Sequence, residues 1–166
     1  RRLYTMYYMR LLKAIEKNYK GAAKKELKRT VLRSIDMENV VSVHRYTMFF
    51  GEDADKVKSS LIPFRYRLSG EAIERLAAEK DIAKISAELA NIGYRHGAEA
   101  PQTVELLTER ISLDYLRKTL RLSQNASVVY LALTELLEIE LKNVKTLIEG
   151  IRYGLDGAVI LNMLVM

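Results

Sequence analysis

Apolar residues recur along most of the chain at intervals of three or four positions, which is the period of an α-helix with one buried face. The first segment shows this spacing at Leu3, Tyr7, Leu11 and Ile15. No segment alternates apolar and polar residues over a convincing length with the period of two that marks a half-buried strand. The pattern therefore predicts an all-α fold.

Glycine, proline and helix-capping residues divide this pattern into separate helices. The first helix should end near Lys20 and Gly21, and a longer one should run over about 22–50 and stop at Gly51. After it, the sequence predicts three short helices, with Asp53, Ser69 and Asp81 as their N-caps, and then a loop over 93–100. The next helix should have Pro101 in its first turn and run to about Leu122. A long helix over about 126–153, followed by Gly154, and a last helix capped by Asp156 complete the prediction.

Two segments that lie 104 positions apart resemble each other, "IDMENVVSV" at 35–43 and the stretch 139–147. In both, an acidic residue precedes an asparagine by three positions, and a glycine and then an aspartate follow. A Tyr–apolar–Arg triplet precedes each copy, at 8–10 and 115–117. We interpret the chain as a duplicated helical unit, with a first repeat over 1–62, connecting helices and a loop over 63–100, and a second repeat over 101–166. The expected structural residues of the repeat are Asp36, Asn39, Gly51 and Asp53 in the first copy and Glu140, Asn143, Gly154 and Asp156 in the second.

The two asparagines stand inside predicted helices, where asparagine is a mediocre helix former. Their shared surroundings indicate a structural reason for an amide. We expect both side chains to be at least partly buried and to hydrogen-bond a neighbouring backbone or helix within their own repeat, because a buried amide left unpaired costs roughly 1–3 kcal/mol.

The charge of the chain is concentrated at its beginning. Residues 1–33 carry eleven of the 27 Lys and Arg residues but only two of the 21 acidic ones, Glu16 and Glu26. Such a basic end suits nucleic acid, anionic lipid or an acidic protein partner, and it is equally the ordinary solvated face of a helix pair. The candidate partner-contact residues are Arg1, Arg2, Lys13, Lys17, Lys24, Lys25, Lys28 and Arg29.

No constellation of reactive side chains is visible. The chain has no cysteine, and its two histidines, His44 and His96, lie 52 positions apart without companions at metal-ligand spacing. There is no glycine-rich phosphate loop and no nucleophile elbow. The most apolar run, 157–166, is well short of the ~20 residues that span a bilayer. We therefore expect no catalytic, metal-binding or cofactor-binding residue, and no enzyme.

An acidic residue, then Asn-apolar-x-Ser/Thr-apolar, then a helix ending in glycine resembles the repeated signature of the family formed by the C-type stalk protein of the prokaryotic V/A-type ATPases and its d-type relative in the eukaryotic V-ATPase. "EIELKNVKTLIEGIRYGLD" is similar to the end of that family's last repeat, and "LYTMYYMRLLKAI" to the Tyr-rich helix that opens a repeat. The stretch 60–94 is similar to the connecting stretch before the next repeat.

The resemblance implies a non-catalytic subunit of the central stalk of a rotary ATPase. Such a subunit is a funnel-shaped helical socket that sits on the membrane rotor ring (the proteolipid subunits) and receives the central shaft. It would couple them for proton or sodium transport, peripherally at the cytoplasmic face of the membrane. The resemblance implies no cofactor, no small-molecule substrate and no nucleic acid.

The sequence departs from that family in two respects. The family usually has three repeats, whereas two are visible here, the middle and the last, so we expect the first to be missing. A basic residue often stands six positions after the asparagine; it is present as Arg45 in the first copy and replaced by Glu149 in the second.

Two other interpretations remain open from the residues alone. A basic helical module could bind nucleic acid or an acidic partner through residues 1–33, although no recognition helix or base-reading motif is visible. A helical enzyme is the third interpretation, without an acid–base or metal constellation to support it.

Overall fold

The computed structural model describes residues 2–51, 54–97 and 101–166. Within these ranges it contains eight α-helices and no strand, which confirms the predicted all-α fold. The helices are α1 (Arg2–Asn18), α2 (Gly21–Phe50), α3 (Ala54–Ser60), α4 (Gly70–Ala78), α5 (Ile82–Asn91), α6 (Val104–Leu122), α7 (Ala126–Arg152) and α8 (Gly157–Met163).

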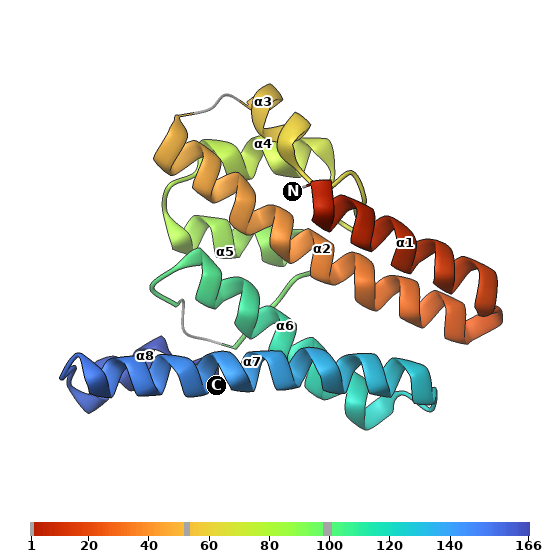
Figure 1. The fold of residues 1–166 in the computed structure, drawn as a ribbon. Coiled ribbons are helices and arrows are strands. Elements are labelled where there is room, and N and C mark those ends of the chain that lie inside the picture. Colours follow the sequence, from red (N-terminus) through yellow and green to blue (C-terminus); the bar gives the residue numbers. More distant parts are fainter. Residues whose placement is uncertain (1, 52–53, 98–100) are drawn as a thin grey trace.

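Two helical hairpins form the frame of the molecule (Figure 1). Helices α1 and α2 run antiparallel to each other, and so do α6 and α7. The short helices α3 and α4 pack along the C-terminal half of α2, α5 packs against α4 and α6, and α8 folds back against the end of α7. The start of α6 also packs on α2, so that the second hairpin is attached to the first.

Two apolar clusters hold these helices together. One cluster contains α2 residues from Met37 to Val43, together with side chains of α3, α4 and α5 and the first turns of α6. The other joins α1, the N-terminal half of α2 and the start of α7, with Ile35 and Val128 both buried in it. Because α2 contributes to both clusters, it is the central helix of the fold.

Several helix ends were predicted correctly. Gly51 ends α2 in the left-handed conformation with φ of 59°, a backbone geometry that glycine adopts without a steric cost. The side chains of Ser69, Asp81 and Asp156 each accept a hydrogen bond from a backbone N–H in the first turn of α4, α5 and α8 respectively.

Other predicted ends were wrong. Pro101 does not lie in the first turn of a helix, since α6 begins at Val104 and is capped by Thr103, whose hydroxyl accepts a hydrogen bond from the N–H of Leu106. Gly21 does not end α1 but opens α2. The predicted cap Asp53 lies outside the described residues.

The helix ends also correct one part of the predicted repeat. Helix α1 ends at Asn18 and α6 at Leu122, which are 104 positions apart, like Asn39 and Asn143. The Tyr–apolar–Arg triplets stand 107 positions apart and therefore do not occupy equivalent turns. In the part of the chain that the structure describes, no helix is both long and apolar enough to cross a membrane.

Candidate functional site

Each repeat asparagine joins its long helix to a segment that follows the next short helix. The side-chain amide of Asn39 donates to the carbonyl oxygen of Ile62 at 3.0 Å, and its oxygen accepts from the N–H of Ile62 at 2.9 Å. Asn143 makes the same pair of hydrogen bonds with Val165, both at 2.9 Å. Asn39 is buried and Asn143 is half-buried, so the expectation of partly buried, hydrogen-bonded amides is confirmed.

Asp36 performs a similar task one turn before Asn39. Its buried carboxylate accepts hydrogen bonds from the backbone N–H groups of Tyr66, Arg67 and Leu68, and from the hydroxyl of Tyr94 at 2.5 Å. Burial, followed by the neighbouring Asp36 carboxylate, raises the pKa of the Tyr94 hydroxyl above its ordinary value. Tyr94 therefore remains a neutral donor, and the turn after α3 is fixed to α2.

Arg33 connects this junction to the second hairpin. Its guanidinium carbon lies 4.6 Å from the centre of the Tyr94 ring and 4.1 Å from that of Tyr115 on α6. A cation over an aromatic face is attracted by the ring quadrupole. Burial lowers the pKa of the Arg33 guanidinium from its usual value, but an arginine remains charged at neutral pH. The contact thus binds α2, the loop after α5, and α6 together.

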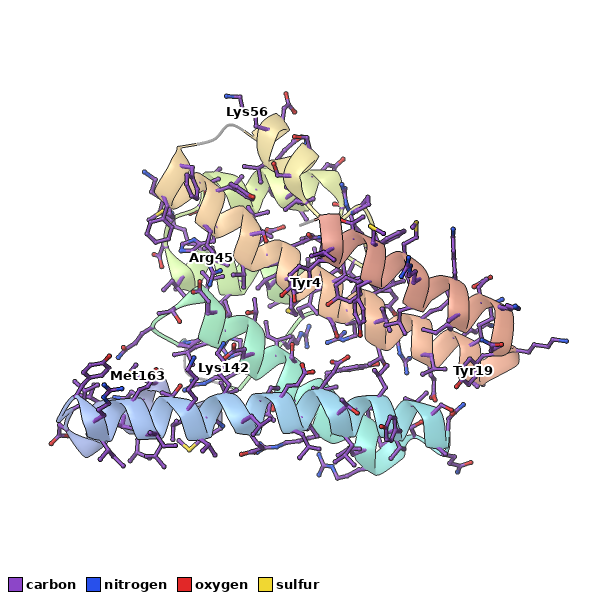
Figure 2. The ribbon with its side chains drawn as sticks, in the orientation of Figure 1. Tyr4, Tyr19, Arg45, Lys56, Lys142 and Met163 are labelled. Atoms are coloured by element: carbon purple, nitrogen blue, oxygen red, sulfur yellow. The ribbon has the colours of Figure 1, made fainter. Side chains whose placement is uncertain are left out.

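A groove of about 860 Å³ opens between the two hairpins, with walls formed by α1, α2, α6 and α7. Figure 2 shows Tyr4 on α1, Arg45 on α2 and Lys142 on α7, all three of which line it. Tyr4, Tyr7 and Tyr8 form the α1 wall. The groove is lined by residues of four helices and combines aromatic and charged side chains, which makes it the main candidate for a binding site.

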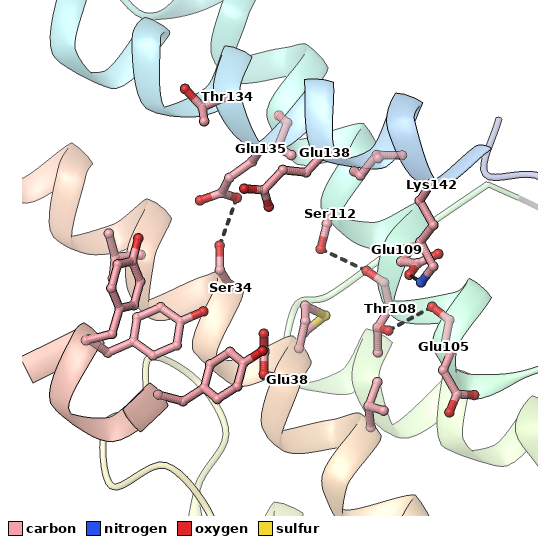
Figure 3. Close-up of a pocket in the computed structure, with 18 of the residues that line it drawn as sticks. Ser34, Glu38, Glu105, Thr108, Glu109, Ser112, Thr134, Glu135, Glu138 and Lys142 are labelled. Carbon is pink, nitrogen blue, oxygen red and sulfur yellow. Dashed lines mark hydrogen bonds and ion pairs between the residues drawn. The ribbon is translucent and has the colours of Figure 1, made fainter. Parts of the chain in front are cut away.

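Carboxylates dominate the other walls of the groove. Arg45 pairs with one of them, Glu105, at 2.9 Å, and Lys142 pairs with Glu109. Figure 3 shows Glu135 and Glu138 on successive turns of α7 pointing into the same space as Glu38 of α2. With two cations against five carboxylates, the groove has a net negative charge at neutral pH. The five carboxylates belong to Glu38, Glu105, Glu109, Glu135 and Glu138.

Glu135 is the most perturbed carboxyl group of this surface. Burial raises its pKa to about 7, with a further contribution from Glu138, and the hydrogen bond that Ser34 donates to it at 2.9 Å opposes this rise. Burial and the carboxylates of Glu38 and Glu135 also raise the pKa of the Tyr8 hydroxyl. The deep part of the groove can therefore gain or lose a proton near neutral pH.

The predicted partner-contact residues that the structure describes all lie on the α1–α2 hairpin, and some of them are paired with carboxylates. Arg1 lies outside the described residues, and the side chain of Arg2 is not described. Lys24 and Lys28 both pair with Glu16, at 2.7 Å and 3.2 Å, and Arg29 lies 3.9 Å from Glu26. Lys13, Lys17 and Lys25 are exposed on the α1–α2 hairpin. None of these lysines lines the groove.

The remaining motif residues are only partly alike in the two copies. Glu140, the counterpart of Asp36, is exposed, and it makes no hydrogen bond or ion pair with the part of the chain that the structure describes. Gly154 has φ of 66°, like Gly51 at the end of the first long helix. Glu149, which replaces the basic residue seen as Arg45, pairs with Lys145 at 3.8 Å.

Sequence reasoning missed several residues that the structure brings together. Arg33 stands at helical spacing from Met37 and Val40, and a cation on an apolar face is a signal that could have been used. The partners of the asparagines, Ile62 and Val165, act through their backbone, so their side chains give no signal. Glu135 lies among several charged residues of α7, and its burial depends on packing against α2.

The sequence matches the family model described as "ATP synthase (C/AC39) subunit" over residues 1–163. No curated protein and no solved structure matched the chain. The family consists of non-catalytic subunits of V/A-type ATPases, which work with the other subunits of the complex. Its match covers the two long helices, both asparagines and the connecting helices between them. The chain therefore belongs to the ATP synthase (C/AC39) subunit family.

Proposed function

We propose that this protein is the central-stalk subunit that couples the shaft of a rotary V/A-type ATPase to its membrane rotor ring, for proton or sodium transport. The observation that carries this proposal is the family match over residues 1–163. The rotor position, the cytoplasmic face of the membrane and the identity of the two partners are parts of the proposal.

The construction of the long helices supports this role. Torque transfer needs a stiff body. Here, polar side chains in the middle of α2 and α7 make hydrogen bonds to the backbone of the segments that follow, in addition to the apolar packing between helices. Asn39 and Asp36 together make hydrogen bonds to Ile62 and to the three backbone N–H groups of 66–68. A buried network whose members are all paired makes the arrangement of its segments specific and rigid.

We propose that the negatively charged groove receives the end of the shaft. Its tyrosines offer apolar contact area on one wall. A shaft end with basic residues would be attracted by the carboxylates of α2, α6 and α7, which would speed and orient the encounter.

We further propose that residues 1–62 and 101–166 are two copies of one unit and that residues 63–100 connect them. The constant spacing of 104 positions, from the end of the first helix of each unit to its asparagine, supports this division. The exposed cations Lys13, Lys17 and Lys25 remain a proposed contact for an acidic partner subunit.

The alternative of a nucleic-acid-binding module finds no support in the family match. Two of the cations that suggested it, Lys24 and Lys28, are already paired with Glu16. We therefore keep a single proposed function.

The test is a pull-down of purified shaft subunits and of detergent-solubilised rotor ring by this chain. We expect both to be retained, and retention of neither would refute the proposed function. Glu138→Lys places a cation in the groove and should weaken shaft retention about tenfold or more if the groove is the binding site of the shaft. Asp114→Lys is the matched control, because Asp114 is exposed on α6 outside the groove and its reversal should leave retention unchanged.

A further inference from the structure

Helix α6 lies on α2 along a well-defined face. The hydroxyl groups of Thr30 and Tyr115 are 3.0 Å apart, and the Arg33 guanidinium stacks on the Tyr115 ring. Further along α2, Met37 and Val40 are buried in the same cluster as Leu107 and Ile111 of α6. This contact joins the end of one repeat to the beginning of the next.

The second long helix has the same face, but the described part of the chain leaves it uncovered. At the spacing of 104 positions, Met37 and Val40 correspond to Leu141 and Val144, and Arg33 corresponds to Leu137. Met37 and Val40 are 6% and 1% exposed, whereas Leu141 and Val144 are 69% and 51% exposed. They belong to a row of exposed side chains spaced three or four residues apart, which we name the α7 stripe: Tyr130, Leu133, Leu137, Leu141, Val144, Ile148 and Ile151.

The α7 stripe is unusual for a protein surface. It follows the helix for about 30 Å, at a rise of 1.5 Å per residue, and each of its side chains is at least 45% exposed. Monomeric soluble proteins rarely expose a continuous apolar patch of this extent, and such patches mark interaction sites. Its spacing is that of the seam of a helix–helix contact.

The complementary half of the contact is also present and uncovered. The α6 residues Leu107 and Ile111, which are 0% and 1% exposed, correspond to Leu3 and Tyr7 on α1. Leu3 is 80% exposed and Tyr7 is 60% exposed, on the side of α1 that lines the groove. We name Leu3 and Tyr7 the α1 face. The described residues therefore make this contact once and leave one copy of each half uncovered.

We propose that a second copy of this chain covers these surfaces, with the α7 stripe of one copy packed on the α1 face of the other in the way that α2 packs on α6. In this arrangement the second repeat of one copy packs on the first repeat of the next copy, head to tail, just as the second repeat packs on the first within one chain. Such a heterologous interface gives either a closed ring or a growing series of oligomers. It does not depend on the proposed function, since it follows from the repeat and from the exposed residues alone.

The test uses analytical ultracentrifugation of the purified chain, from low micromolar concentration upwards. Wild-type protein should associate, and Leu141→Glu in the α7 stripe or Tyr7→Glu in the α1 face should each weaken association about tenfold or more, because each would bury an unpaired carboxylate. Leu122→Glu is the control: Leu122 is 68% exposed outside both surfaces, and its substitution should not change association. Circular dichroism verifies that every variant is folded.

An equimolar mixture of the two interface variants gives the decisive result. The Tyr7→Glu copy retains an intact α7 stripe and the Leu141→Glu copy an intact α1 face, so the mixture should form a one-to-one dimer at concentrations at which each weakened variant alone stays monomeric. A mixture that stays monomeric overturns the proposal. Wild-type protein that stays monomeric also overturns it, as does a Tyr7→Glu variant that associates like wild type, which would indicate α7 pairing with α7.

Discussion

Asn39 and Asn143 make the same two hydrogen bonds but in different surroundings. Asn39 is 0% exposed, and the backbone groups of Ile62 that it satisfies are enclosed by the α1–α2 core. Val165 is itself only 4% exposed, but Asn143 is half-buried, so water can enter the space that a removed amide leaves and pair with the Val165 backbone. The cost of removing an amide depends on whether its former partners stay dry, so equivalent residues of the two repeats have unequal energetic weight.

We expect Asn39→Ala to lower the free energy of unfolding by about 1–3 kcal/mol, and Asn143→Ala to lower it by about 1 kcal/mol or less. Urea denaturation followed by circular dichroism measures both. Ser42→Ala on the same helix serves as a control, because the Ser42 hydroxyl donates to the carbonyl of Glu38 in an exposed position, where its loss should cost little. Equal losses at the two positions would contradict the role of burial.

Glu135 should make stability depend on pH. Its pKa is raised from 4.5 to about 7 in the folded state, so folding takes up a proton between these values. The free energy of unfolding should therefore fall as pH rises from about 4.5 to 7, where the buried carboxyl group becomes ionised.

The comparison of Glu135→Gln with wild type isolates this effect. Glutamine resembles the protonated carboxyl group, so the variant should be more stable than wild type at pH 8, and the difference should shrink towards pH 5. Urea midpoints measured across this pH range provide the test. Glu140→Gln on the same helix is the control, since Glu140 is exposed. A difference for Glu135→Gln that does not vary with pH would rule out this titration.

At the scale of the elements, α8 is held by two contacts with α7. One is the Asn143–Val165 pair just after α8, and the other is the approach of Ile160 to Gly150. A Cβ at position 150 would lie 2.7 Å from Cγ1 of Ile160, closer than real side chains approach. Gly150 is therefore needed for close packing between the helices, and not for a turn.

We expect Gly150→Ala to loosen α8, seen as faster hydrogen exchange over 157–163. In an Ile160→Ala background the obstacle is absent, so the same change should be neutral or stabilise by up to about 1 kcal/mol through helix propensity. Equal effects in the two backgrounds would show that the Ile160 contact does not explain the glycine.

The elements themselves could largely be predicted from the sequence, because their ends depend on local chemistry. Gly51, Ser69 and Asp156 act within one turn of their own position, where cap rules apply. Pro101 shows the limit of such rules, since Thr103, two residues later, provides the better cap. The groove and the perturbed pKa of Glu135 could not be predicted, because they arise where α1, α2, α6 and α7 meet across more than a hundred positions of sequence.

At the scale of the whole molecule, one surface takes part in both proposals. Tyr7 belongs to the α1 face and also lines the groove in which we propose that the shaft is seated. A copy of α7 packed on α1 would narrow the entrance to that groove. Self-association and shaft binding should therefore exclude each other, so the isolated chain would associate with itself only while its shaft partner is absent.

We accordingly expect added shaft subunits to dissociate the self-associated chain into complexes that contain one copy of it, as measured by sedimentation velocity. Glu138→Lys is the matched control: it weakens the groove but leaves both the α7 stripe and the α1 face unchanged, so its oligomers should persist in the presence of shaft. If shaft subunits bind to the oligomer without dissociating it, their binding site lies outside the groove. Dissociation of the Glu138→Lys oligomers to the same extent as wild type would lead to the same conclusion, because the groove charge would then play no part.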